Sequence, residues 1–129
     1  MNLEVSTRAF PAERSVLPEI RRLVEAEARR HDFSDPVGDL QLAVTEACSN
    51  AIVHSGTHEI RVSINQIGTC LQITIEDDGV YDQVLPVPDT DGRGHRGLHL
   101  MAAVVDDFSL RRGTNEERGT VVRLLKCSP

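Results

Sequence analysis

The sequence lacks an excess of basic residues, since 14 lysines and arginines stand against 20 aspartates and glutamates and give a net charge of −6. Nucleic-acid backbones and anionic membrane surfaces attract proteins mainly through positive charge. We therefore expect neither direct nucleic-acid binding nor a membrane partner. An anionic ligand would have to be held locally, by backbone N–H groups, a metal ion or a few arginines.

Cysteine is also scarce, and Cys48, Cys70 and Cys127 show no C-x-x-C spacing. This number and spacing predict neither a disulfide framework nor a zinc site. No basic N-terminal segment precedes an apolar run, and no apolar run approaches the roughly 20 residues that cross a bilayer. We therefore expect a cytoplasmic protein with reduced thiols.

The chain has the length of one domain and is too short for two ordinary ones, with 129 residues of which 40% are hydrophobic. It contains no internal repeat, linker or low-complexity segment. The sequence therefore predicts a single domain over residues 1–129.

Two segments have the apolar periodicity of helices. In residues 13–30, apolar side chains recur three or four positions apart, with charged side chains between them. For residues 36–54, Asp35 is a candidate N-cap, Pro36 takes the first helical position, and Gly56 stands where the helix would end. We expect two amphipathic helices over these ranges.

Three further segments alternate between apolar and polar residues, as strands with one buried face do. They lie at 3–5, 60–64 and 71–75, and Gly68 separates the last two. Glycine between two alternating runs is typical of a hairpin. A short N-terminal strand and a β-hairpin are therefore predicted.

The second half of the chain is less regular. We interpret the Pro-, Asp- and Gly-rich stretch up to Arg96 as a loop, followed by a short helix at 97–105 and strands at about 107–112 and 119–126. Helices and antiparallel strands that do not alternate as β-α-β units are typical of α+β domains. We expect a two-layer sandwich, in which helices cover one face of a mainly antiparallel, mixed β-sheet.

The second predicted helix carries two polar residues, Glu46 and Asn50, next to its apolar stripe. At 100° per residue they lie about 40° apart, on one side of the helix. Half-buried polar groups cost free energy unless they have partners, and a hydrated metal ion or a nucleophile's proton would serve. A surface salt bridge for Glu46 and a loop-tying amide for Asn50 are the structural alternatives.

Two other segments suggest a ligand. Asp77 ends an apolar strand and Gly79 follows, so the carboxylate would accept a hydrogen bond from an exocyclic amine while glycine lets a flat base approach. An ordinary Asp-Gly turn is the alternative. Residues 92–97 are glycine-rich and precede a predicted helix, an arrangement that exposes N–H groups to phosphate but also occurs in ordinary loops.

Together these segments resemble the GHKL superfamily of histidine-kinase-like ATPases, which have the Bergerat fold, and within it the anti-sigma-factor serine kinases of bacterial partner-switching systems. Residues 46–54 resemble the family's Glu-Ala-x-x-Asn-Ala-x-x-His helix, and residues 75–79 resemble its adenine-binding strand end. Residues 97–101 resemble the helix after the lid, and 119–122 the last strand. The resemblance covers nearly the whole chain.

The resemblance implies a role for each matching residue. Asn50 would coordinate the Mg²⁺ that bridges the ATP phosphates, and Glu46 would be the catalytic group that orients or deprotonates a substrate serine. The other ATP-binding residues that it implies are Asp77 and Gly79 at the adenine, Gly94, Arg96, Gly97 and Leu98 near the phosphates, and Thr120 as a supporting hydroxyl.

The resemblance also implies partners. The protein would bind a sigma factor as an anti-sigma factor and phosphorylate a serine of an anti-anti-sigma antagonist with a STAS domain, thereby regulating transcription in a bacterial stress response. It also allows a homodimer.

Two positions depart from the family pattern. Tyr81 and His95 occupy places where these proteins usually have glycine, and both restrict the backbone near the phosphates. They motivate an alternative function, a non-catalytic regulatory module that binds a sigma factor or antagonist with weak or absent nucleotide turnover. The catalytic half of a histidine kinase is a third hypothesis, but the predicted helix 13–30 contains no phosphoacceptor histidine.

Overall fold

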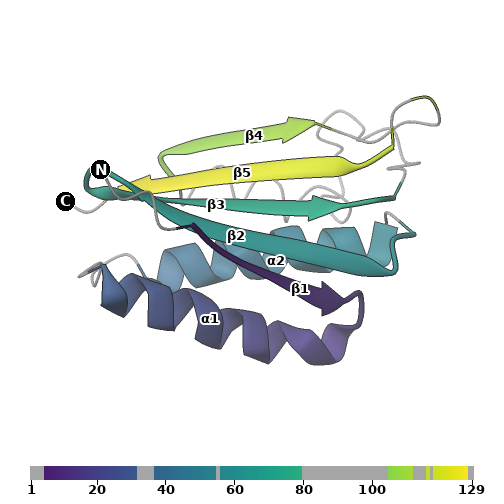
Figure 1. The fold of residues 1–129 in the computed structure, drawn as a ribbon, viewed down its shortest axis with the longest axis horizontal. Coiled ribbons are helices and arrows are strands. Elements are labelled where there is room, and N and C mark those ends of the chain that lie inside the picture. The colour runs from purple at the N-terminus through teal and green to yellow at the C-terminus, as the bar shows by residue number, and fades with distance from the viewer. Residues whose placement is uncertain are drawn as a thin grey trace, which may run out of the picture.

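The protein forms a two-layer α+β sandwich, in which two helices cover one face of a five-stranded sheet (Figure 1). This arrangement is taken from a computed structural model of the chain. The residues that it describes are 5–31, 37–54, 56–79, 105–111, 116 and 118–127. The expected fold class is confirmed.

The sheet has the strand order β1-β2-β3-β5-β4, and every described pairing in it is antiparallel. The strands are β1 (Val5–Pro11), β2 (Glu59–Ile67), β3 (Cys70–Asp77), β4 (Asp107–Arg111) and β5 (Thr120–Cys127). The last strand of the chain is therefore inserted between β3 and β4. All five expected strands exist, with boundaries shifted by a few residues.

Both predicted helices are present. A 3₁₀ turn, Arg14–Val16, leads into α1 (Leu17–Arg30), and α2 spans Val37–His54. The buried residues of α1 lie four positions apart, at Ile20, Val24 and Ala28, which is the spacing that places side chains on one face of a helix. Neither described α-helix has the combined length and hydrophobicity of a membrane-spanning segment.

The strands β2 and β3 form the predicted hairpin around Gly68, which adopts a left-handed φ of +60°. Such a φ costs little only for glycine. Alternate side chains of both strands are fully buried against the helices, while their neighbours are half-buried on the outer face of the sheet. One continuous core results, because the inner face of the sheet and the apolar faces of α1 and α2 contribute to the same cluster.

The prediction of reduced thiols is wrong for two of the three cysteines. Cys70 and Cys127 form a disulfide, and they are also the final partners in the β3–β5 register. Their sequence separation is 57 residues, so only the pairing of β3 with β5 brings them together. Cys48 is a free, buried thiol in α2, and burial raises its pKa to about 12.

Several expected features lie outside the described residues. They are the N-cap at Asp35 with Pro36, the loop up to Arg96, and the helix at 97–105 except for Val105.

Burial along the hairpin predicts which side chains stabilise the fold. Ile73 is fully buried in β3, whereas Ile67 at the end of β2 is 47% exposed. Ile73→Ala should lower the free energy of unfolding by about 2–5 kcal/mol, because it removes buried methyl groups and leaves a cavity. The matched change Ile67→Ala should cost less than about 1 kcal/mol. Urea denaturation of both variants measures the two values, and equal losses would contradict the described core.

Candidate functional site

The polar pair on α2 lies where the sequence placed it, beside the buried stripe of the helix. Six residues of α2 are at most 5% exposed and pack into the core: Leu40, Ala43, Val44, Ala47, Cys48 and Ala51. Glu46 and Asn50 are half-buried. One helical turn separates them, so their side chains lie on the same side of α2. They occupy the border between core and surface, where a polar group is both held in place and accessible.

At the end of β3, a buried carboxylate closes a tight turn. Asp77 is only 3% exposed, and its Oδ1 accepts a hydrogen bond of 2.8 Å from the backbone N–H of Gly79. This is the side-chain-to-backbone bond of an Asx turn, so the structural alternative considered for Asp77 is present. It does not exclude ligand binding, because a carboxylate has capacity for about four donors.

The start of β5, which is distant in the sequence, lies beside the turn at the end of β3. We refer to Asp77, Gly79 and Thr120, which meet here, as the cradle. Thr120 is 2% exposed and lies opposite Asp77 in the β3–β5 register. Its neighbour Gly119 donates its N–H to the carbonyl oxygen of Gly79 at 3.0 Å. Two backbone segments therefore meet where the two polar side chains are buried.

Two features of the structure require glycine at position 119. Its φ is +106°, which L side chains rarely adopt, and a Cβ there would lie 3.2 Å from the carbonyl oxygen of Asp77. A side chain at this position would therefore push β5 away from the end of β3. The close approach of Asp77 and Thr120 depends on this glycine.

Asp78 points to a different partner from Asp77. Its carboxylate forms two hydrogen bonds with the guanidinium of Arg61, at 3.0 and 3.1 Å, and its N–H donates to Thr57 Oγ1 at 3.2 Å. The Arg61 hydrogen bonds lower the pKa of Asp78 and raise that of Arg61. Two adjacent aspartates thus have separate roles, since the exposed Asp78 holds the turn to β2 while Asp77 is buried.

The two parts of the site lie at the same end of the molecule. Figure 1 shows the C-terminal end of α2, the end of β3 and the start of β5 together on the right. The register agrees, because Ile60, six residues after α2 ends, pairs with Asp77. Asp77 and Thr120 each lie two residues from a core residue of the same strand, Ile75 and Val122, and thus lie on the sheet face that the helices cover. The carboxylate of Asp77 and the polar pair of α2 consequently belong to the same layer interface.

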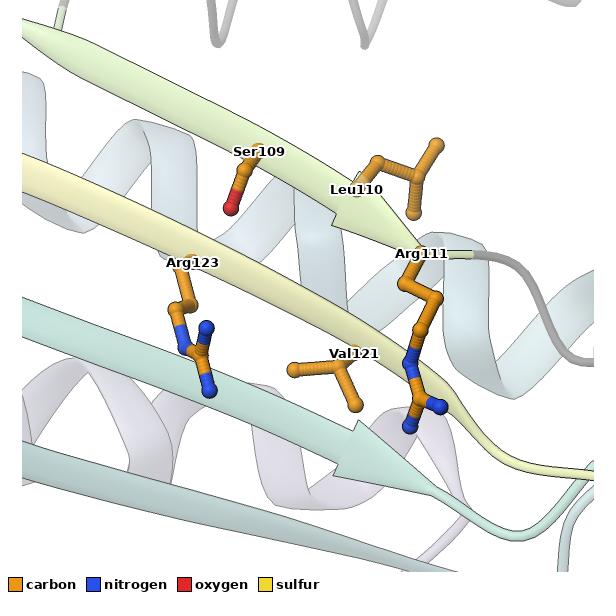
Figure 2. Close-up of a pocket in the computed structure, with 5 residues that line it drawn as sticks. All are labelled: Ser109, Leu110, Arg111, Val121 and Arg123. Atoms are coloured by element: carbon orange, nitrogen blue, oxygen red, sulfur yellow. The ribbon is translucent and has the colours of Figure 1, made fainter.

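A shallow depression on the opposite face of the sheet is separate from this site. It has a volume of about 220 Å³ and lies over β4 and β5 (Figure 2). Its lining residues are Ser109, Leu110, Arg111, Val121 and Arg123. In Figure 2 the helices lie behind the sheet and the arginine side chains in front of it. This depression therefore has no part in the cradle at Asp77.

Of the predicted site residues, the structure describes Glu46, Asn50, Asp77, Gly79 and Thr120. It brings Asp77, Gly79 and Thr120 into one cradle. The predicted phosphate-binding residues, Gly94, Arg96, Gly97 and Leu98, lie outside the described residues, as do Tyr81 and His95.

Sequence reasoning missed Arg61 and Thr57, which hold the turn at Asp78. No motif marks them, because Arg61 is one of several alternating polar residues of β2. Only the pairing of β2 with β3 places it beside Asp78.

Within the described part of the chain, no three His, Cys, Asp or Glu side chains gather as a metal cage. Mg²⁺ seldom uses such a cage and takes one or two protein oxygens together with waters and phosphate oxygens. The half-buried carboxamide of Asn50 offers one such oxygen, so the residues present fit this ion.

The chain is similar in sequence to serine-protein kinases named RsbW. The relatives from Bacillus thuringiensis, Bacillus cereus and Bacillus anthracis are each 27% identical over 118 residues. The alignment covers 78% of this chain and 73% of each relative.

Two solved structures have a similar fold. The histidine kinase domain of a blue-light-activated kinase from Erythrobacter litoralis has a TM-score of 0.54 at 19% identity, and 92% of this chain is covered. The chain spans only 61% of that protein's length. Histidine kinase AdeS from Acinetobacter baumannii has a TM-score of 0.55 at 12% identity, over 97% of this chain and 68% of AdeS. At these identities the likeness concerns the fold.

A protein-family model matches most of the chain. Residues 10–126 match the model of the histidine kinase-like ATPase domain, a range that contains both helices, β2, β3 and β4, and all of β5 except Cys127. This range also includes Glu46, Asn50, Asp77 and Thr120. The chain therefore belongs to the histidine kinase-like ATPase domain family.

Proposed function

We propose that this protein binds ATP with Mg²⁺ and transfers the γ-phosphoryl group to a serine of a partner protein, while also binding a sigma factor. The observation that carries the proposal is the buried cradle of Asp77, Gly79 and Thr120 at the same end of the fold as Glu46 and Asn50. Family membership and the likeness to serine-protein kinases support it.

Asp77 is the residue that would read the adenine. One of its oxygens is occupied by the Gly79 N–H, so the carboxylate is fixed in orientation by the turn. A second acceptor position on the same carboxylate would receive the exocyclic amine of adenine. Gly79 carries no side chain that would obstruct a flat base beside Asp77, and Thr120 would add a hydroxyl beside the base.

Asn50 is the protein ligand that we assign to Mg²⁺. When bound, the ion would supply positive charge that offsets the negative charge of the phosphates. The chain itself has a net charge of −6, so a tetra-anionic nucleotide needs such local compensation. We propose that four further residues contact the phosphates: Gly94, Arg96, Gly97 and Leu98.

Glu46 is the group that we assign to the substrate hydroxyl. It precedes Asn50 by one helical turn, so a serine directed at the terminal phosphate would come within reach of its carboxylate. Phosphoryl transfer relies mostly on positioning and electrostatics. A half-buried helix is suited to this task because packing fixes its backbone.

The proposed protein partners are a sigma factor and an anti-anti-sigma antagonist with a STAS domain, whose serine is the phosphate acceptor. The relatives are serine-protein kinases, and this likeness supports a serine as acceptor. In this role the protein would act in the cytoplasm, in transcriptional control of a stress response, and a homodimer is one assembly compatible with it.

The adenine assignment predicts a selective effect at position 77. In Asp77→Asn, the carboxamide oxygen still accepts from Gly79, but an NH₂ group replaces the second acceptor and faces the adenine amine. ATP should then raise the melting temperature far less than in the wild type, where ligand at 100 times its Kd adds about 2.7 kcal/mol. Differential scanning fluorimetry measures both shifts. Asp78→Asn is the matched control, and an equal loss there would contradict the assignment.

The metal assignment predicts that the effect of Asn50→Ala depends on Mg²⁺. Without a protein ligand for the ion, the additional stabilisation that Mg²⁺ gives to the ATP complex should disappear, while binding of ATP in the presence of EDTA stays unchanged. Isothermal titration calorimetry with and without Mg²⁺ separates the affinity for ATP alone from the additional affinity that Mg²⁺ provides. A variant that retains the full difference between both conditions would exclude Asn50 as a ligand.

The catalytic assignment predicts that Glu46→Gln lowers phosphorylation of the antagonist by about 10²–10⁴-fold with little change in ATP affinity, as for loss of a general base. Incorporation of radiolabelled phosphate into the antagonist serine measures the rate. If the wild-type protein binds its partners but forms no phosphoserine, the protein is the non-catalytic binding module instead.

A further inference from the structure

The disulfide joins strands that also carry the cradle. Cys70 and Cys127 are the last of eight registered pairs between β3 and β5, and Asp77 and Thr120 are the first pair at the other end of the same ladder. The bridge and the buried polar pair thus terminate one continuous run of backbone pairing.

The three cysteines have different access to reagents. Cys70 and Cys127 are half-buried at the end of the sheet, whereas Cys48 is fully buried in α2. Burial raises the pKa of Cys48 to about 12, so it forms almost no thiolate near neutral pH. Thiol–disulfide exchange needs a thiolate and physical access. The chain therefore confines such chemistry to one pair and keeps its third thiol out of it.

We propose that Cys70–Cys127 is a reversible redox site, opened by low-molecular-weight dithiols and closed by low-molecular-weight disulfides, and that closure fixes the β3–β5 register at the nucleotide cradle. The part that concerns the nucleotide rests on the proposed function. Disulfides in reducing compartments are mostly transient, catalytic or redox-sensing. The cytoplasmic location that belongs to the proposed function would place this bridge in such a compartment.

The exchange is balanced in electrons and protons. On opening, one thiolate of a dithiol attacks a sulfur of the bridge and forms a mixed disulfide, and the second thiolate of the reagent displaces the remaining cysteine. Two electrons and two protons pass to Cys70 and Cys127, and the reagent leaves as a disulfide. On closing, glutathione disulfide accepts the two electrons and is released as two molecules of glutathione.

The position of Cys127 favours closure after reduction. Its backbone N–H donates to Asp106 Oδ2 at 2.7 Å, and Asp106 N–H donates to the carbonyl oxygen of Leu125 at 2.8 Å. These contacts do not involve sulfur, so they keep Cys127 tied to the residue before β4, on the side of β5 away from β3, whether the bridge is open or closed. Closure is then an intramolecular step with a high effective concentration.

The register explains how the bridge affects a site at the far end of the ladder. A slip of one residue would turn every side chain of β5 to the opposite face and separate Thr120 from Asp77. A covalent link between two paired residues excludes all slipped registers at once. It also restrains the unfolded chain over a separation of 57 residues.

Thiol counting in the full-length native protein tests the site itself. After incubation with glutathione disulfide, iodoacetamide should label no cysteine, and after incubation with dithiothreitol it should label Cys70 and Cys127 but not Cys48. A second exposure to glutathione disulfide should abolish the labelling. Labelling of Cys70 and Cys127 under oxidising conditions, or a bridge that stays closed in excess dithiothreitol, would overturn the proposal.

Thermal stability and amide hydrogen exchange test, without nucleotide, whether the Cys70–Cys127 bridge is coupled to the cradle. Reduction should lower the melting temperature by roughly 5 °C or more and speed exchange of the Gly119 amide, which bonds to Gly79, by at least about threefold. The double variant Cys70→Ser with Cys127→Ser should behave as the reduced protein in both conditions. Cys48→Ser, which leaves the bridge intact, should keep the full response. Identical Gly119 exchange in the oxidised and reduced proteins would refute coupling.

ATP affinity distinguishes this proposal from the proposed function. The oxidised protein should bind ATP several-fold more tightly than the reduced protein, and equal affinities would refute an effect on the nucleotide. Absence of ATP binding in both states would instead refute the proposed function, while thiol counts and Gly119 exchange still decide the redox site.

Discussion

The burial of Asp77 is the constraint on which the rest of the site depends. A carboxylate removed from water must be compensated by hydrogen bonds, and the Gly79 N–H supplies one at 2.8 Å. This bond fixes a turn, the turn brings the Gly79 carbonyl to the Gly119 N–H, and that contact sets the start of β5 with Thr120. Burial, turn geometry and strand register are therefore different aspects of one arrangement.

Alternation along the strands gives the two faces of the sheet separate properties. Among the buried residues of the described strands, the inner face is apolar except at one end, where Asp77 and Thr120 lie. α2 repeats this change, since its buried stripe has Glu46 and Asn50 beside it in the half nearer that end. The site is thus the polar end of the hydrophobic core, and the same packing that stabilises the domain fixes the positions of its functional groups.

Local patterns were sufficient to predict the helices, the hairpin at Gly68 and the half-buried position of Glu46 and Asn50, because each depends on residues close in sequence. They also marked Asp77 as a candidate, whereas Thr120 was implied only by the resemblance to the ATPase family. The disulfide and the Arg61–Asp78 pair were not predictable in the same way. Both result from pairing between strands, and periodicity shows that a segment is a strand without showing which strand lies next to it.

The insertion of β5 between β3 and β4 has a consequence for how the site forms during folding. The hairpin β2–β3 contains Asp77 and is local, but its partner Thr120 comes from the last strand, which must enter the sheet beside β3. Strand pairings between residues far apart in the sequence form late in folding, because closing a long loop costs more conformational entropy than closing a short one. A nascent chain that has emerged only as far as β4 would contain Asp77 but would lack β5, the strand that encloses it. Competence to bind a ligand here is therefore a property of the finished sheet.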